Sequence, residues 1–250
     1  MKIKFCESYQ ILRLLSLKAE LAELPNVRVG TLRGRTVVRR YYKNSKGNVV
    51  FKSSFADTPA GQKICQTAVR REEIETEIKN IENQLGKHIA DMLERCKFKL
   101  CKSILNESLW NSLGNDENPQ PKTSDYHHNG IQMRSRTEVL VAEILDELGL
   151  EYKYEPKIQF GNEVFHPDFL VYIRSLKRCL IIEFFGMSED ESYLYKNVHK
   201  VSVYANCGLI MNRDVIGLFG SKDSLVSNEF IYNCVVMTIN LLASEVVQLK

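Results

Sequence analysis

Two acidic residues, Asp168 and Glu183, have the spacing expected of a divalent-metal site. Asp168 closes a Pro-Asp step that opens one apolar run, and Glu183 ends a second apolar run at 179–182, with a basic turn between them. If the runs form neighbouring strands, about 4.8 Å separates the strands and the two carboxylates lie close together. Mg²⁺ prefers carboxylate oxygens, and a bound Mg²⁺ neutralises phosphate charge and activates water. The spacing therefore predicts a Mg²⁺ site, which would also accept Mn²⁺, suited to cleaving phosphodiesters.

The residues around this pair have the periodicity of a mixed α/β sheet flanked by helices. The expected elements are helix 134–149, strands 151–160, 164–173 and 179–185, helix 189–206, strand 209–211 and a closing helix 230–247. The short strand 209–211 follows a helix, so it is expected to run parallel to its neighbour. This order, αβββαβ, brings Glu138 in the first turn of the first helix and Lys196 and Lys200 in the second helix near the carboxylates.

The segments RSRTEVLVAEIL, PDF and IIEFFG, followed by the helix with Lys196 and Lys200, resemble the PD-(D/E)XK nuclease superfamily. More narrowly, residues 130–225 are similar to restriction-endonuclease-like domains of the very-short-patch repair type. The resemblance implies Mg²⁺-dependent cleavage of DNA on an αβββαβ core. It also implies that Asp168 and Glu183 bind the metal, with help from a backbone carbonyl, and that Glu138 positions a metal-bound water.

The sequence departs from the family pattern at Phe185, where the motif has Lys two residues after Glu on the same strand face. Phe cannot stabilise charge on an attacked phosphate. Lys200 is the favoured substitute, because a migrated Lys on this helix recurs in the superfamily, and Lys196 one turn earlier is the alternative. If neither Lys serves, the chain is a catalytically silent, nuclease-like subunit that binds DNA or supports an assembly.

Three other polar residues near the site have simpler interpretations. His166, two residues before Asp168, is interpreted as a polar residue at a strand edge, and a contact with metal or substrate is the alternative. Glu143 and Glu155 are candidates for the shell of the site, with surface charge as the preferred interpretation.

The N-terminal part is predicted to contain a helix at 6–24, a β-hairpin of 35–42 and 48–53, and a long helix 58–88 that begins at a Thr-Pro cap. No acidic residue lies between Glu23 and Asp57, while the interval holds many cations. The cations assigned to nucleic acid are Arg28, Arg33, Arg35, Arg39, Arg40, Lys43 and Lys46, with Lys52 and two Tyr nearby. They are expected to contact DNA, or less readily RNA, through phosphates. The alternative is a contact with the acidic stretch of the helix that follows.

Composition sets the remaining expectations. Residues 1–113 are predicted to form a helical region with a basic hairpin, residues 114–130 a linker, and residues 131–250 the nuclease-like domain. The long helix either forms a homodimer or packs on the first helix. Seven Cys without a CxxC pair favour reduced thiols in the cytoplasm, and no apolar stretch approaches the length of a membrane span.

Overall fold

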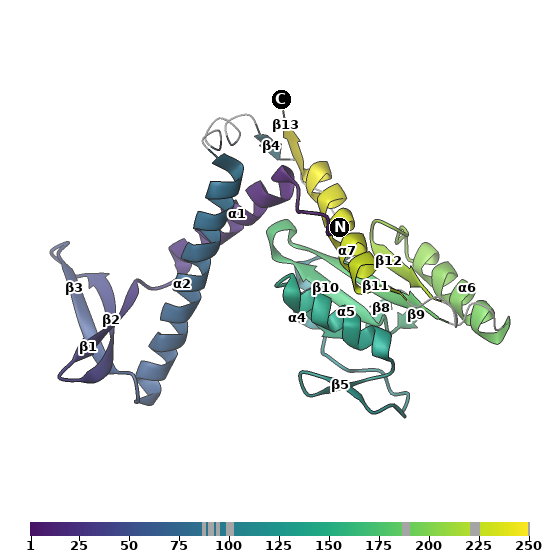
Figure 1. The fold of residues 1–250 in the computed structure, drawn as a ribbon, viewed down its shortest axis with the longest axis horizontal. Helices are drawn as coiled ribbons and strands as arrows, with labels where there is room; N and C mark the ends of the chain where they lie inside the picture. The colour runs from purple at the N-terminus through teal and green to yellow at the C-terminus, as the bar shows by residue number, and fades with distance from the viewer. Residues whose placement is uncertain are drawn as a thin grey trace. The chain divides into compact units, whose positions relative to one another are not determined.

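A computed structural model describes residues 1–86, 89, 93, 96–98, 103–186, 191–220 and 226–249. The chain folds as two compact units (Figure 1). The larger unit combines Met1–Tyr9 with Cys96–Lys250, and the smaller unit is Gln10–Arg95. None of the helices in the described ranges is both long enough and apolar enough to cross a membrane.

The smaller unit contains most of helix α1, a three-stranded antiparallel sheet and a long helix α2. Its elements are α1 Glu7–Glu23, β1 Val27–Leu32, β2 Arg35–Lys43, β3 Val49–Phe55 and α2 Pro59–Leu85. The expected hairpin is confirmed as β2 and β3, and β1 adds a third strand on the other side of β2. Thr58 caps α2 as predicted, because its side chain accepts a hydrogen bond from the Gly61 amide.

The apolar stripe of α2 packs on α1. Leu14 and Leu17 of α1 form one buried cluster with Ile74 and Ile81 of α2. These contacts confirm one of the two alternatives for the long helix, namely that it packs on the first helix. The homodimer stays a prediction, and the predicted end of the helix at residue 88 lies outside the described residues.

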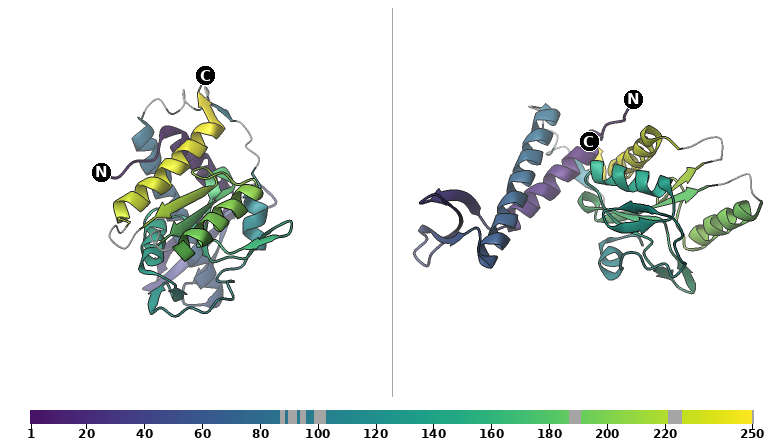
Figure 2. Two further views of the ribbon diagram at one scale, coloured as in Figure 1. Left: turned by 90° about the vertical axis from the view of Figure 1, so that its right-hand side faces the viewer. Right: turned by 60° about the horizontal axis from the view of Figure 1, so that its bottom comes forward.

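The larger unit has a central four-stranded mixed sheet in the order β12-β11-β10-β7. The elements are β4 Cys96–Phe98, α4 Glu107–Ser112, β5 Tyr126–His128, β6 Ile131–Met133, α5 Arg136–Glu147, β7 Glu151–Tyr154, β8 Ile158–Phe160, β9 Glu163–Phe165, β10 Phe169–Ile173, η2 Arg174–Leu176, β11 Arg178–Phe185, α6 Glu191–Asn206, β12 Val215–Phe219, α7 Asn228–Val246 and β13 Val247–Leu249. Strands β7, β10 and β11 pair antiparallel, and β12 joins β11 in parallel. Helices α7 and α6 lie on opposite sides of this sheet (Figure 2).

The predicted mixed α/β class is correct, and three strand predictions need correction. The expected strands 151–160 and 164–173 are each divided, because residues 158–165 leave the main sheet and form the hairpin β8-β9. The expected strand 209–211 is wrong: the parallel partner of β11 is β12, which begins at Val215. Gly208 adopts a left-handed φ of 75°, and the residues after it turn through Asn212 before the strand can start.

The domain boundary also lies elsewhere than predicted. The units divide at residues 95 and 96, and the segment predicted as a linker belongs to the larger unit. The amides of Asp116 and Glu117 donate to the carbonyls of Tyr154 and Glu155. These bonds hold the segment along the end of β7, so its polar composition reflects an ordered loop. Of the described residues that follow the boundary, 96–98 form the strand β4 and 107–112 the short helix α4.

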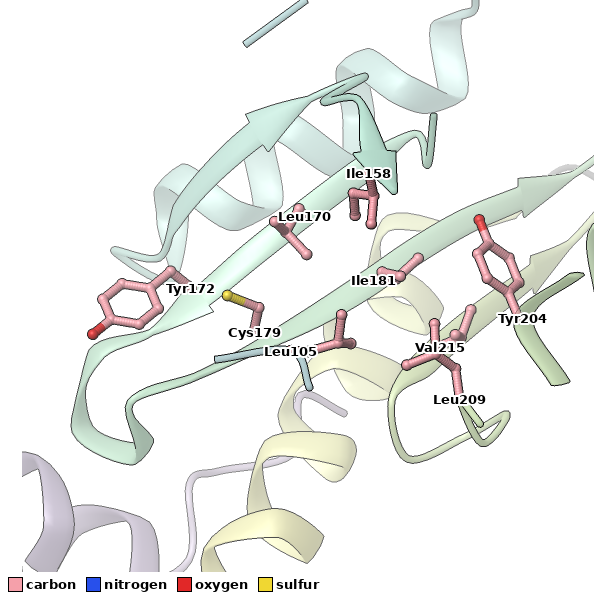
Figure 3. Close-up of a cluster of buried hydrophobic side chains, with 9 residues drawn as sticks. All are labelled: Leu105, Ile158, Leu170, Tyr172, Cys179, Ile181, Tyr204, Leu209 and Val215. Carbon is pink, nitrogen blue, oxygen red and sulfur yellow. The ribbon is translucent and has the colours of Figure 1, made fainter. Parts of the chain in front are cut away.

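One face of the central sheet is covered by apolar side chains from several elements (Figure 3). Leu170 of β10 and Ile181 of β11 lie at its centre, and Tyr204 of α6 packs beside them. Since alternate residues of a strand face opposite sides, Glu183 and Phe185 share this face with Ile181. The sheet face that packs in the core therefore also directs the Glu183 carboxylate toward α6.

Candidate functional site

Asp168 and Glu183 lie opposite each other at the ends of β10 and β11. Phe169 pairs with Ile182, and the next position in this register aligns Asp168 with Glu183. The Phe184 amide donates to Asp168 Oδ2 over 2.7 Å, which fixes the carboxylate at the strand end. The amide and carbonyl of one strand residue point to the same side, so the Phe184 carbonyl is also directed toward Asp168.

Helix α6 brings a cation and a phenol to this pair. Lys200 Nζ lies 2.7 Å from Glu183 Oε2 and 3.9 Å from Asp168 Oδ1. Tyr204, one turn later, donates its hydroxyl to Glu183 Oε1. Lys196, one turn earlier, is an exposed residue of the same helix. Lys200, the favoured one of the two lysines singled out in the sequence, thus contacts both carboxylates.

Phe185 occupies the position where the motif would have lysine. Its side chain is fully buried, and its ring stacks on Phe219 of β12 with 4.9 Å between centroids. The strand therefore supplies an apolar contact here, and the ammonium group comes from α6 instead.

Glu138 is held at the start of α5 by three donors. The Ser135 side chain caps the helix, accepts from the Glu138 amide over 3.2 Å and lies 3.1 Å from Glu138 Oε1. The Arg134 amide and the Tyr154 hydroxyl both donate to Glu138 Oε2, at 2.8 and 2.7 Å. Across the described ranges, no group of three or more His, Cys, Asp and Glu side chains converges on one ion position. Glu138 lies close enough to Asp168 for that carboxylate to raise its pKa.

Burial and mutual repulsion perturb the acids of this site. Burial and the neighbouring Asp168 raise the pKa of Glu183 to about 8, although Lys200 opposes the shift. Burial also raises the pKa of Asp168, again against Lys200. Burial and Asp168 raise the pKa of Glu138. Burial lowers the pKa of Lys200, but Glu183 and Asp168 outweigh it and hold the pKa above its ordinary value.

These observations fit a divalent cation. Glu183 has no exposed surface, and the Asp168 side chain is 16% exposed, so two acids share a desolvated corner with one ammonium group. Burial is the largest cause of the raised pKa values of Glu183 and Asp168, and the charge of Asp168 adds to it at Glu183. The donors are hard oxygens from neighbouring strands, the type that Mg²⁺ and Mn²⁺ prefer.

Glu155 was a candidate for the shell of the site, but the preferred interpretation as a surface charge is wrong. It was expected on the surface, as Glu143 is, but only 3% of it is exposed, and its φ of 42° is left-handed. Arg134 Nε pairs with its Oε1 at 2.7 Å, and its charge contributes to the raised pKa of Asp168. The Glu155-Pro156 step directly after a strand was the available signal, because such a step favours a turn over a solvated strand end.

His166 lies between β9 and β10, at a strand edge as expected, and its side chain is half-buried. Its Nε2 is buried and has no hydrogen-bond partner among the described residues. Burial lowers the pKa of His166, against the charges of Glu155 and Glu117.

The basic residues of the smaller unit lie on its sheet and turns. Arg28 is in β1; Arg35, Arg39, Arg40 and Lys43 are in β2; Arg33 and Lys46 are in the two turns. The alternative, a contact with the acidic stretch of α2, is met at Arg28, which borders one hollow with Glu72 and Glu75. The ion pairs of that stretch are with other cations. Glu73, Glu75 and Glu77 pair with Arg70, Arg71 and Arg13.

The chain was compared with known proteins in three ways. No protein-family model matches it, and searches of curated proteins and of solved structures find no similar protein. The functional interpretation therefore depends on the residues and the geometry described above.

Proposed function

We propose that this protein is a Mg²⁺-dependent endodeoxyribonuclease that hydrolyses DNA phosphodiester bonds. The observation that carries the proposal is the apposition of Asp168 and Glu183 on neighbouring strands with the Lys200 ammonium against both. The element order α5-β7-β10-β11-α6-β12 is compatible with the αβββαβ core of the PD-(D/E)XK nucleases, which the sequence resembles. The proposal places the protein in the cytoplasm, where its described cysteines are free thiols.

Each residue has a role in this proposal. Asp168, Glu183 and the Phe184 carbonyl would hold Mg²⁺, or Mn²⁺ in its place. The ion would neutralise phosphate charge and activate a water molecule. Glu138 would accept a hydrogen bond from that water, because Arg134 and Tyr154 fix its carboxylate beside Asp168.

Lys200 would stabilise the additional negative charge on the attacked phosphate. In the ion-free protein its ammonium group neutralises Glu183, so it must give up this contact to reach a phosphate. Its side chain is 42% exposed, which leaves it room to turn outward. Lys200 of α6 would thereby take the role of the lysine that the strand does not have at position 185.

A second candidate function has its own supporting observation. Both oxygens of Glu183 already have partners, Lys200 on one and Tyr204 on the other, and the side chain has no exposed surface. Such a closed network is what a catalytically silent, nuclease-like subunit that binds DNA would retain.

Nicking of supercoiled plasmid DNA tests the first function. The protein should nick DNA with Mg²⁺ or Mn²⁺ and not with EDTA, and Asp168→Asn should abolish nicking while leaving the circular dichroism spectrum unchanged. Glu143→Gln is the matched control, because Glu143 is an exposed acid on the same helix as Glu138. Undiminished nicking by Asp168→Asn would refute the assignment.

Calorimetry separates the two candidates. Titration of the folded wild-type protein with millimolar Mg²⁺ should release or absorb heat. The same titration of Asp168→Asn should give no such heat. If the wild-type protein gives no heat with Mg²⁺ or Mn²⁺ and does not nick DNA, the silent subunit is the better description.

A further inference from the structure

One face of the sheet in the smaller unit combines arginines with aromatic rings. Directly opposite residues of an antiparallel sheet share a face. Arg28 of β1 is opposite Arg39 of β2, and Tyr41 of β2 is opposite Phe51 of β3. Because side chains alternate along a strand, these residues lie on one face, which we call the arginine-aromatic face.

The guanidinium groups of this face lie over its rings. The Arg28 Cζ is 5.8 Å from the centroid of the Tyr41 ring, and the Arg39 Cζ is 5.6 Å from that of Phe51. At the other end of β2, the Arg35 Cζ lies 4.1 Å from the centroid of Phe55. Such stacking holds a guanidinium in place while its N–H groups stay available to an anion.

The N-terminal part of β1 lies next to α2. Val27, Arg28 and Val29 border a hollow that is lined on the helix by Ala68, Arg71, Glu72 and Glu75. Arg40 of β2 and Lys52 of β3, which are opposite each other, belong to the other face of the sheet. On the arginine-aromatic face Val37 is buried and Arg39 and Tyr41 are half-buried, whereas Phe51 stays exposed.

Few acids balance the charge of this face. Among the described residues Arg35 pairs with Asp57, which is the first acid after Glu23. No carboxylate of the described chain lies in ion-pair contact with Arg28 or Arg39. Phe51 is 54% exposed, so a large flat ring lies next to these cations.

We propose that the arginine-aromatic face binds single-stranded DNA, with Arg28 and Arg39 on phosphates and Phe51 stacked on a base. The inference rests on the proposed function for its choice of DNA as the partner. A duplex hides the faces of its bases in the stack, so only an unpaired strand uses the exposed ring as well as the cations. Phosphate contacts supply affinity without sequence preference.

The test measures binding of the full-length protein to a fluorescent oligothymidine by anisotropy, in EDTA so that no cleavage occurs. Arg28→Gln/Arg39→Gln is compared with Arg40→Gln/Lys52→Gln, which removes the same charge from an opposed pair on the other face. The first variant should lower the slope of log affinity against log salt by about 1.4, because each phosphate that an arginine neutralises on a single strand adds about 0.7 to that slope. Phe51→Leu, which keeps an apolar side chain, should weaken binding by roughly fivefold to a hundredfold, the worth of one stacked base.

Three results would overturn the inference. Equal losses in the two double variants would assign binding to overall charge and not to this face. Unchanged binding by Phe51→Leu would show that no base stacks on Phe51. Equal affinity for a duplex of the same length would show that the face does not prefer a single strand. Because the assay contains no metal, the two proposals can fail separately. Oligothymidine binding by a wild-type protein that does not nick DNA would refute only the proposed nuclease, and nicking without oligothymidine binding would refute only this inference.

Discussion

Replacing Lys200 with Met tests whether this ammonium group holds the carboxylate corner together. Breaking a fully buried ion pair costs about 3–5 kcal/mol, whereas breaking an exposed one costs about 0.2–1 kcal/mol. Glu183 has no exposed surface and the Lys200 side chain is 42% exposed, so the pair lies between these limits. We expect Lys200→Met to lower the free energy of unfolding by about 2 kcal/mol when Glu183 is ionised.

The loss should depend on pH in a defined direction. Burial raises the pKa of Glu183 from 4.5 to about 8, so the folded state binds a proton there that the unfolded state has released. Stability from this group therefore falls as pH rises from 4.5 through 8. Removing Lys200 raises the pKa of Glu183 further. The difference in free energy of unfolding between Lys200→Met and wild type should therefore grow from below about 1 kcal/mol near pH 5.5 to about 2 kcal/mol near pH 9.

Urea unfolding followed by circular dichroism in EDTA gives both values. Lys196→Met, an exposed lysine one turn away on α6, is the matched control and should change stability by less than about 0.5 kcal/mol. The double variant Lys200→Met/Glu183→Gln should recover part of the loss, since the buried charge is then absent. Equal stability of Lys200→Met and wild type near both pH values would refute the reasoning.

Three further predictions concern other parts of the chain. Arg178→Met leaves the buried carboxylate of Asp214 without its partner and should lower the free energy of unfolding by about 3–5 kcal/mol in urea titrations. Gly61→Ala should destabilise by more than about 1 kcal/mol in the same assay, because a Cβ there would lie 1.9 Å from the Phe55 carbonyl oxygen. Mg²⁺ at about 100 times its dissociation constant should add about 2.7 kcal/mol of stability, and Asp168→Asn should remove that gain in thermal melts.

Most elements of the fold follow from local sequence. The Thr58-Pro59 cap, the Asn44–Gly47 turn and the apolar period of residues 136–147 each act over a few residues, and each was predicted correctly. The departure of β8-β9 from the main sheet and the boundary at residue 95 were not predicted. Both depend on contacts between residues far apart in the chain, such as the Asp116 amide on the Tyr154 carbonyl.

The carboxylate pair was predictable for a similar reason. A short hairpin between two apolar strands almost fixes their register, so the opposition of Asp168 and Glu183 follows from turn length. The hydrogen bond from the Tyr154 hydroxyl to Glu138 was not predictable, because Tyr154 belongs to β7 and Glu138 to α5. Glu155 was misjudged because burial of a charge depends on a partner, here Arg134, that spacing along the chain does not reveal.

The choice between Lys196 and Lys200 shows where spacing stops being informative. The two residues are four apart, so they lie on nearly the same side of a helix and differ by about 6 Å along its axis. Which one meets Glu183 depends on how far α6 is shifted along the sheet. Tyr204 sets that shift, because its ring is buried in the core cluster and its hydroxyl contacts Glu183. A residue that looked like core packing thus determines which lysine serves the site, and Tyr204→Phe should weaken the Lys200–Glu183 contact without removing any charge.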